Sequence, residues 1–88
     1  MVSKKVKIKN PTGLHLRPAG LLCELAMNYQ CKVTFNTDNN YEANAKSVLS
    51  VLGACVRSGE EITIVCDGAD EEKAIVEITT AIEDGLGE

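Results

Sequence analysis

An 88-residue chain that is 44% hydrophobic and 25% charged suits one compact domain, expected over residues 1–88, and does not have the composition of a disordered chain. No stretch approaches the roughly 20 consecutive apolar residues of a membrane helix, and the N-terminal residues lack the apolar core of a signal peptide, so we expect a cytoplasmic protein without membrane insertion. A net charge of −4 with 3% aromatic residues argues against direct nucleic-acid binding, because phosphate backbones demand clustered Lys and Arg and single-stranded bases demand aromatic stacking platforms.

The N-terminal part of the chain predicts a strand, a turn and a helix. Apolar residues alternate with lysines over residues 5–9, which indicates a half-buried strand. The Asn-Pro-Thr-Gly sequence at 10–13 favours a turn, since proline fixes one dihedral angle and glycine permits positive φ. Apolar residues then recur at three- and four-residue spacing from about 16 to 28, which predicts an amphipathic helix with Pro18 tolerated in its first turn.

The next segment predicts a β-hairpin. Apolar and polar residues alternate over residues 31–35, as expected of a second strand. The sequence Asp-Asn-Asn at 38–40 favours a turn, and a short third strand is expected around 41–43.

The remainder of the chain predicts two helices around a fourth strand. Ser47 is a suitable N-cap for a helix over the apolar residues 48–56, which the Ser-Gly turn at 58–59 would end. The fourth strand is expected at 62–66 from its alternating pattern. Asp70 is expected to cap a last helix that ends near Gly85.

These elements define the expected fold class. Their order is β-α-β-β-α-β-α, and the strands alternate between apolar and polar residues rather than being apolar throughout. Such strands fit a sheet with one covered and one exposed face. We therefore expect an α+β protein, an open-faced two-layer sandwich of a four-stranded antiparallel sheet with three helices on one face.

The single histidine is the strongest candidate for chemistry. His15 falls between the predicted turn and the start of the first helix, where unpaired backbone N–H groups and a partial positive charge favour a phosphate. Arg17 can add a charge-assisted contact to the same oxygens. A neutral imidazole can attack phosphorus without a metal or cofactor, because phosphoryl transfer mainly requires alignment and charge stabilisation. The alternative is that His15 is only a polar residue at a helix start.

The residues around His15 also carry a family resemblance. Residues 13–19 read Gly-Leu-His-Leu-Arg-Pro-Ala, which resembles the active-site motif of HPr, the histidine-containing phosphocarrier of the bacterial phosphoenolpyruvate-dependent sugar phosphotransferase system. Similar segments occur at 44–47, 59–64, 68–71 and in the Gly-Leu-Gly-Glu ending at 85–88. The resemblance therefore spans the chain.

The resemblance implies a specific relay. In HPr proteins, Enzyme I is phosphorylated by phosphoenolpyruvate and passes the group to the histidine, and the carrier then donates it to sugar-specific enzyme IIA proteins. By this resemblance His15 would carry the group on Nδ1 and Arg17 would stabilise it. The carrier would be a monomer without a cofactor and would not act as a stand-alone enzyme.

Regulation and docking are implied in the same way. Ser47 matches the serine that HPr kinase/phosphorylase modifies, and a phosphate there would hinder acceptance from Enzyme I and favour a transcription factor of the catabolite-control type. The alternative is an unmodified N-cap serine. The resemblance also implies an apolar docking patch beside the active site, which we expect to include Leu16, Gly20, Glu24, Met27, Val48, Leu49 and Leu52.

Other classes of function fit the sequence less well. A regulatory paralogue that binds transcription factors without carrying phosphate would lack the active-site histidine, so His15 counts against it. Four cysteines could in principle hold zinc, but no C-x-x-C pair exists and three of the four fall on predicted apolar faces. We expect no metal and reduced thiols. No paired carboxylates, nucleophile–base pair or glycine-rich phosphate loop indicates an enzyme.

Overall fold

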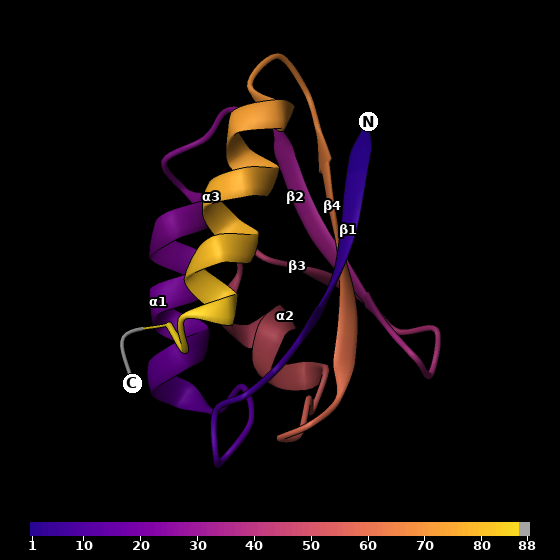
Figure 1. Ribbon diagram of the computed structural model, residues 1–88, viewed down its shortest axis with the longest axis vertical. Coiled ribbons are helices and arrows are strands. Elements are labelled where there is room, and N and C mark those ends of the chain that lie inside the picture. Colours follow the sequence, from indigo (N-terminus) through magenta and orange to yellow (C-terminus); the bar gives the residue numbers. More distant parts are fainter. Residues whose placement is uncertain (87–88) are drawn as a thin grey trace.

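The computed structural model describes residues 1–86, and its elements follow the predicted order (Figure 1). The strands are β1 (Val2–Lys7), β2 (Lys32–Thr37), β3 (Glu42–Asn44) and β4 (Glu61–Asp67), and the helices are α1 (Leu16–Ala26), α2 (Val48–Gly53) and α3 (Glu71–Glu83). The final residues of the Gly-Leu-Gly-Glu ending, 87 and 88, lie outside the described residues.

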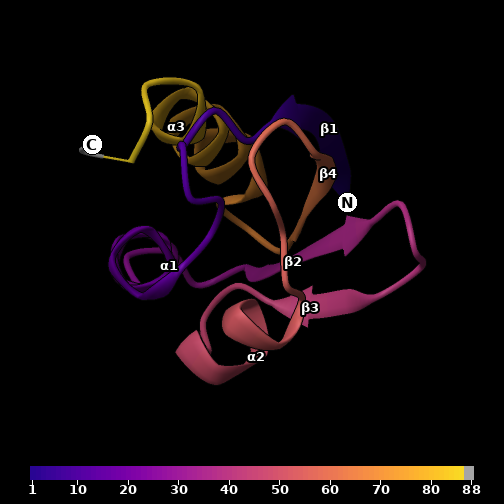
Figure 2. The same ribbon diagram turned by 90° about the horizontal axis from the view of Figure 1, so that it is seen from below.

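The strands form one sheet in the order β1-β4-β2-β3, and all neighbours are antiparallel. The alternation along β4 decides which face is covered, because Ile62, Ile64 and Cys66 are buried while the residues between them are not. The helices pack on this face: Figure 1 shows α1 and α3 along it, and Figure 2 shows α2 on the same side next to β3. The predicted α+β open-faced sandwich is confirmed. Among residues 1–86, no helix combines the length and the apolar character that a membrane span requires.

Helix α2 ends earlier than the apolar pattern predicts. The helix was expected to continue through Val56, but it ends at Gly53. Cys55 has a left-handed φ of 52°, a conformation that cannot continue a right-handed helix. The Cys55 amide donates to the Leu52 carbonyl at 3.1 Å, which tightens the last turn. Val56 is buried as part of the following loop rather than on a helical stripe.

Asp70 differs from its predicted role. It occupies the N-cap position of α3, but its side chain makes no capping hydrogen bond. Its two carboxylate oxygens instead accept the amides of Gln30 and Cys31, each at 2.9 Å. The Gln30 amide, followed by that of Cys31, holds the pKa of the Asp70 carboxyl below its usual range. The expectation of a side-chain cap is therefore wrong, and Asp70 joins the start of β2 to the start of α3.

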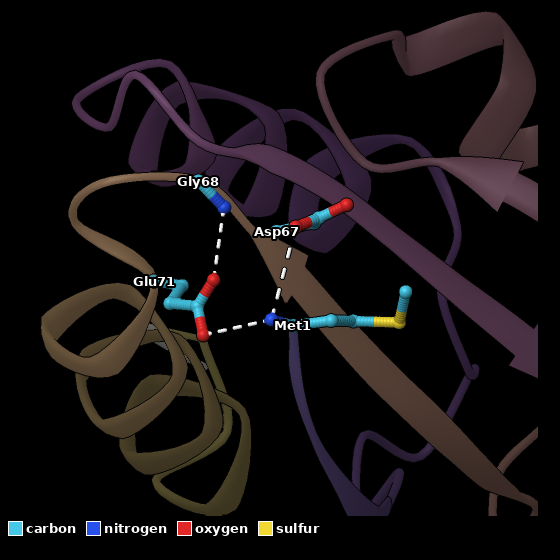
Figure 3. A network of polar contacts seen from close by, with 4 residues as sticks. All are labelled: Met1, Asp67, Gly68 and Glu71. Atoms are coloured by element: carbon cyan, nitrogen blue, oxygen red, sulfur yellow. Dashed lines mark hydrogen bonds and ion pairs between the residues drawn. The ribbon is translucent and has the colours of Figure 1, made fainter.

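The N-terminus is held between two carboxylates (Figure 3). The Met1 ammonium donates to Glu71 Oε2 at 2.9 Å and lies 3.8 Å from Asp67 Oδ1, while Glu71 Oε1 accepts the Gly68 amide at 3.0 Å. The hydrogen bond to Glu71 raises the pKa of the amine above its ordinary 8.0. The Gly68 amide, together with the ammonium, lowers the pKa of Glu71 below its ordinary 4.5. This cluster fastens the start of β1 to α3.

Replacing the Glu71 carboxylate tests this clamp. The amine contributes stability below pH 8.0 and loses it as the pH rises through its raised pKa. Glu71 contributes above pH 4.5 and loses it as the pH falls through its lowered pKa. We therefore expect Glu71→Gln to lower the melting temperature most between these two values, and NMR titration to show the amine pKa falling towards 8.0.

The control is Glu72→Gln, which removes an exposed carboxylate from the same turn of α3. The samples must retain Met1, which mass measurement verifies. An amine pKa that Glu71→Gln leaves unchanged contradicts the clamp.

Candidate phosphoryl-acceptor site

His15 is exposed at the N-cap position of α1, as the sequence predicts. Its backbone is extended, with φ −82° and ψ −168°, and its carbonyl accepts the Ala19 amide at 2.9 Å. The amides of Leu16 and Arg17 have no acceptor within the helix, and Pro18 has no N–H to satisfy. The imidazole stands at the positive end of the helix dipole. The first turn contains no acidic residue that would reduce this positive potential.

The loop before His15 is fixed by a close backbone contact. The Asn10 carbonyl accepts the Gly13 amide at 2.9 Å and closes the predicted turn, and the Leu14 amide donates to the Val56 carbonyl at 3.0 Å. Gly13 has φ +71°, and a Cβ there would lie 2.3 Å from the Val56 oxygen. Leu14 is 3% exposed. The chain therefore enters the core at Leu14 and leaves it at His15.

Arg17 lies in the first turn of α1 and is exposed. Within residues 1–86, no carboxylate forms an ion pair with its guanidinium. The side chain can therefore turn toward an anion at the helix start without breaking an existing ion pair. Its five N–H donors suit phosphate oxygens in a way that a lysine would not.

The expected docking patch is partly exposed. Three large apolar side chains stand out: Leu16 at 67%, Met27 at 63% and Leu49 at 82% exposed. Glu24 is also exposed, whereas Gly20, Val48 and Leu52 are half-buried, and Leu52 packs against the core. The α1 members recur every three or four residues and share one helix face. Helix α2, which packs against α1, carries the others.

Ser47 is the N-cap of α2, as predicted. Its Oγ accepts the Ser50 amide at 3.3 Å. Lys46, the residue before it, is anchored to α1 and to the segment after it. The Cys23 thiol of α1 donates to the Lys46 carbonyl at 3.1 Å, and the Lys46 ammonium donates to the carbonyl of Tyr29, just beyond α1, at 2.6 Å. Neither contact could be predicted from the sequence, since they join residues 17 and 23 positions apart.

The cysteines do not form a metal centre in the described part of the chain. All four are free thiols, and residues 1–86 contain no cluster of three or more metal-ligating side chains. Burial raises the pKa of the Cys31 thiol, and it raises that of Cys66 to about 12. Burial therefore favours the protonated, less reactive form of both thiols.

Comparisons with known proteins agree with this geometry. A family model described as the PTS HPr component phosphorylation site matches residues 2–84. The chain belongs to the HPr family. The phosphocarrier protein HPr of Mycoplasma genitalium is 36% identical over 76 residues, which cover 86% of each chain.

Solved HPr-family structures share the whole fold. HPr from Thermoanaerobacter tengcongensis has a TM-score of 0.94 at 35% identity and covers 100% of this chain and 98% of its own. Crh of Bacillus subtilis has a TM-score of 0.76 at 30% identity over 97% of both chains, and its crystal structure is described as an intertwined dimer with a swapped domain.

Two glycine substitutions test how this HPr-family chain fixes its histidine loop. Gly13 and Gly59 both have left-handed φ, +71° and +88°, but an added Cβ meets the backbone only at Gly13. We expect Gly59→Ala to lower the free energy of unfolding by about 1–2 kcal/mol. Gly13→Ala should lower it clearly more and speed hydrogen exchange of the Leu14 amide. Urea unfolding and NMR-detected exchange measure both effects, and equal losses would contradict the close contact.

Proposed function

We propose that this protein carries a phosphoryl group on His15, accepting it from phosphorylated Enzyme I and donating it to a sugar-specific enzyme IIA protein. The observation that supports the proposal most strongly is the exposed imidazole at the N-terminus of α1, two residues before Arg17. Membership of a family named for its phosphorylation site adds to this support.

On the carrier side, the transfer needs a nucleophilic nitrogen and donors for the phosphoryl oxygens, and this chain presents both. The lone pair of a neutral imidazole nitrogen, Nδ1 by family resemblance, forms a bond to phosphorus as the bond between phosphorus and the donor group of Enzyme I breaks. The amides of Leu16 and Arg17 and the Arg17 guanidinium balance the charge on the phosphoryl oxygens. The second transfer reverses these steps with the acceptor protein. The chain therefore acts as a carrier rather than a stand-alone enzyme.

An exposed site suits a carrier, because two different partners must each reach the same nitrogen. The exposed side chains of Leu16, Met27 and Leu49 offer apolar area to a partner on the two packed helices α1 and α2. We propose that both partners dock on the surface formed by α1 and α2.

Ser47 is proposed as a regulatory site on the same surface. A phosphate on its hydroxyl adds about two negative charges at the start of α2, where Leu49 is 82% exposed. This charge would oppose docking of Enzyme I and favour a catabolite-control transcription factor. HPr kinase/phosphorylase with ATP should add one phosphoryl group to the wild type and none to Ser47→Ala; modification of both would reject Ser47 as the site.

A cytoplasmic monomer with one domain over residues 1–88 remains a prediction. The swapped dimer described for Crh makes light scattering the relevant measurement. A mass near the 9.4 kDa of one chain supports a monomer, and twice that mass rejects it.

The first prediction of this function concerns His15 and Arg17. Incubation with Enzyme I and phosphoenolpyruvate should add one acid-labile phosphoryl group, and His15→Ala should add none. Arg17→Gln should still accept the group but about 10- to 100-fold more slowly, since it loses a hydrogen bond to a charged group worth about 1.5–3 kcal/mol. Arg57→Gln is the control, because Arg57 is also exposed. Equal rates for the two arginine variants contradict the role of Arg17.

The second prediction concerns docking. Leu49→Asp and Ser47→Asp each add a negative charge to the α1–α2 surface, and we expect each to weaken binding of Enzyme I at least about tenfold in calorimetric titration. Val76→Asp is the matched control, since Val76 is 62% exposed but lies on α3. A loss of affinity in Val76→Asp as large as in Leu49→Asp would reject the proposed docking surface.

A further inference from the structure

Asn10 is a buried polar residue in the loop that leads to His15. It is 2% exposed, and its Nδ2 donates to the Gly85 carbonyl at 2.8 Å. A buried amide costs free energy unless its polar atoms have partners. Gly85 lies just beyond α3 in the turn that ends the helix, where the Gly85 amide donates to Ile82 and the Leu86 amide to Ala81. Asn10 therefore supplies a side-chain donor to a carbonyl at the end of α3.

The main chain of the same residue closes the turn before the histidine. The Asn10 carbonyl accepts the Gly13 amide at 2.9 Å, and Pro11 restricts the dihedral angles between them. Gly13 in turn lies so close to the Val56 carbonyl that a Cβ would come within 2.3 Å of its oxygen. Figure 2 shows the connection between β1 and α1 passing the C-terminal end of α3. The loop is thus fastened to α3 at its start and to the segment before β4 at its end.

On its solvent side, the seam between the loop and α3 is lined mostly by exposed side chains. The surface depression at this seam is lined by Lys9, Pro11, Glu83 and Asp84 together with the bonded pair, and these four side chains are exposed. Within the described residues, the Asn10 to Gly85 hydrogen bond gives this seam a directional contact.

We infer that Asn10 is a positioning residue for phosphoryl transfer, which sets the place of the His15 imidazole by locking its loop to the end of α3. This inference depends on the proposed function of His15. Asn10 acts through the turn and does not touch the phosphoryl group. Because the turn is short and stiff, a shift at Asn10 moves His15, and a displacement of about 1 Å in a reacting group can slow a reaction about 100-fold.

The test separates placement of the imidazole from docking. Asn10→Asp keeps the size of the side chain but sets an oxygen against the Gly85 carbonyl, and Asn10→Ala removes the donor without adding charge. We expect both to lower kcat for acceptance from phosphorylated Enzyme I by about 10- to 100-fold, with KM changed less than about twofold because the α1–α2 surface is intact. Asn39→Asp, the same change at an exposed turn, should behave as wild type.

The outcomes distinguish the positioning role of Asn10 from the phosphoryl-carrier function of His15. Circular dichroism first establishes that the variants are folded at the assay temperature. A folded variant with wild-type kcat, or one that changes only KM, overturns the inference while the proposed function stands. Loss of folding in both variants also overturns it, since Asn10 is then a residue of global stability. Failure of the wild type to accept phosphate rejects the proposed function itself.

Discussion

The contact between the loop before His15 and the segment before β4 determines how the histidine is presented. The Leu14 amide bonds to the Val56 carbonyl, and Gly13 approaches so closely that a side chain would collide there. Leu14 is thereby drawn into the core, so the next residue must leave it. That residue is also the N-cap of α1. Exposure of the imidazole and its place at the positive end of a helix are therefore consequences of one backbone arrangement.

The fold combines a packed core with a reactive group on the surface. The sheet and the helices on one of its faces bury the apolar side chains, whereas His15 and Arg17 project from the surface. A carrier must meet a donor and an acceptor in turn, and a deep pocket would hinder both meetings. Alignment and charge supply most of what phosphoryl transfer requires, so a helix terminus and one arginine can be sufficient on an open surface.

Features that depend on neighbouring residues could be predicted from the sequence. The structure contains the predicted strands, the Asn-Pro-Thr-Gly turn before His15 and the Ser47 cap. Each of these depends on residues that are neighbours in the sequence. Side-chain hydrogen bonds between distant segments could not be predicted from the sequence. Asp70 has the expected position but bonds to amides about 40 residues away. The burial of Asn10 against Gly85 leaves no periodic signature, since it depends on how α3 ends.

Phosphorus–nitrogen NMR on protein labelled with ¹⁵N-histidine and phosphorylated by Enzyme I shows which atom carries the phosphoryl group. His15 is the only histidine in the chain, so the spectrum has a single possible acceptor ring. We expect one ³¹P resonance coupled to a ring nitrogen of His15. A protein that has gained a phosphoryl group but whose ³¹P signal shows no coupling to that imidazole would contradict transfer to His15.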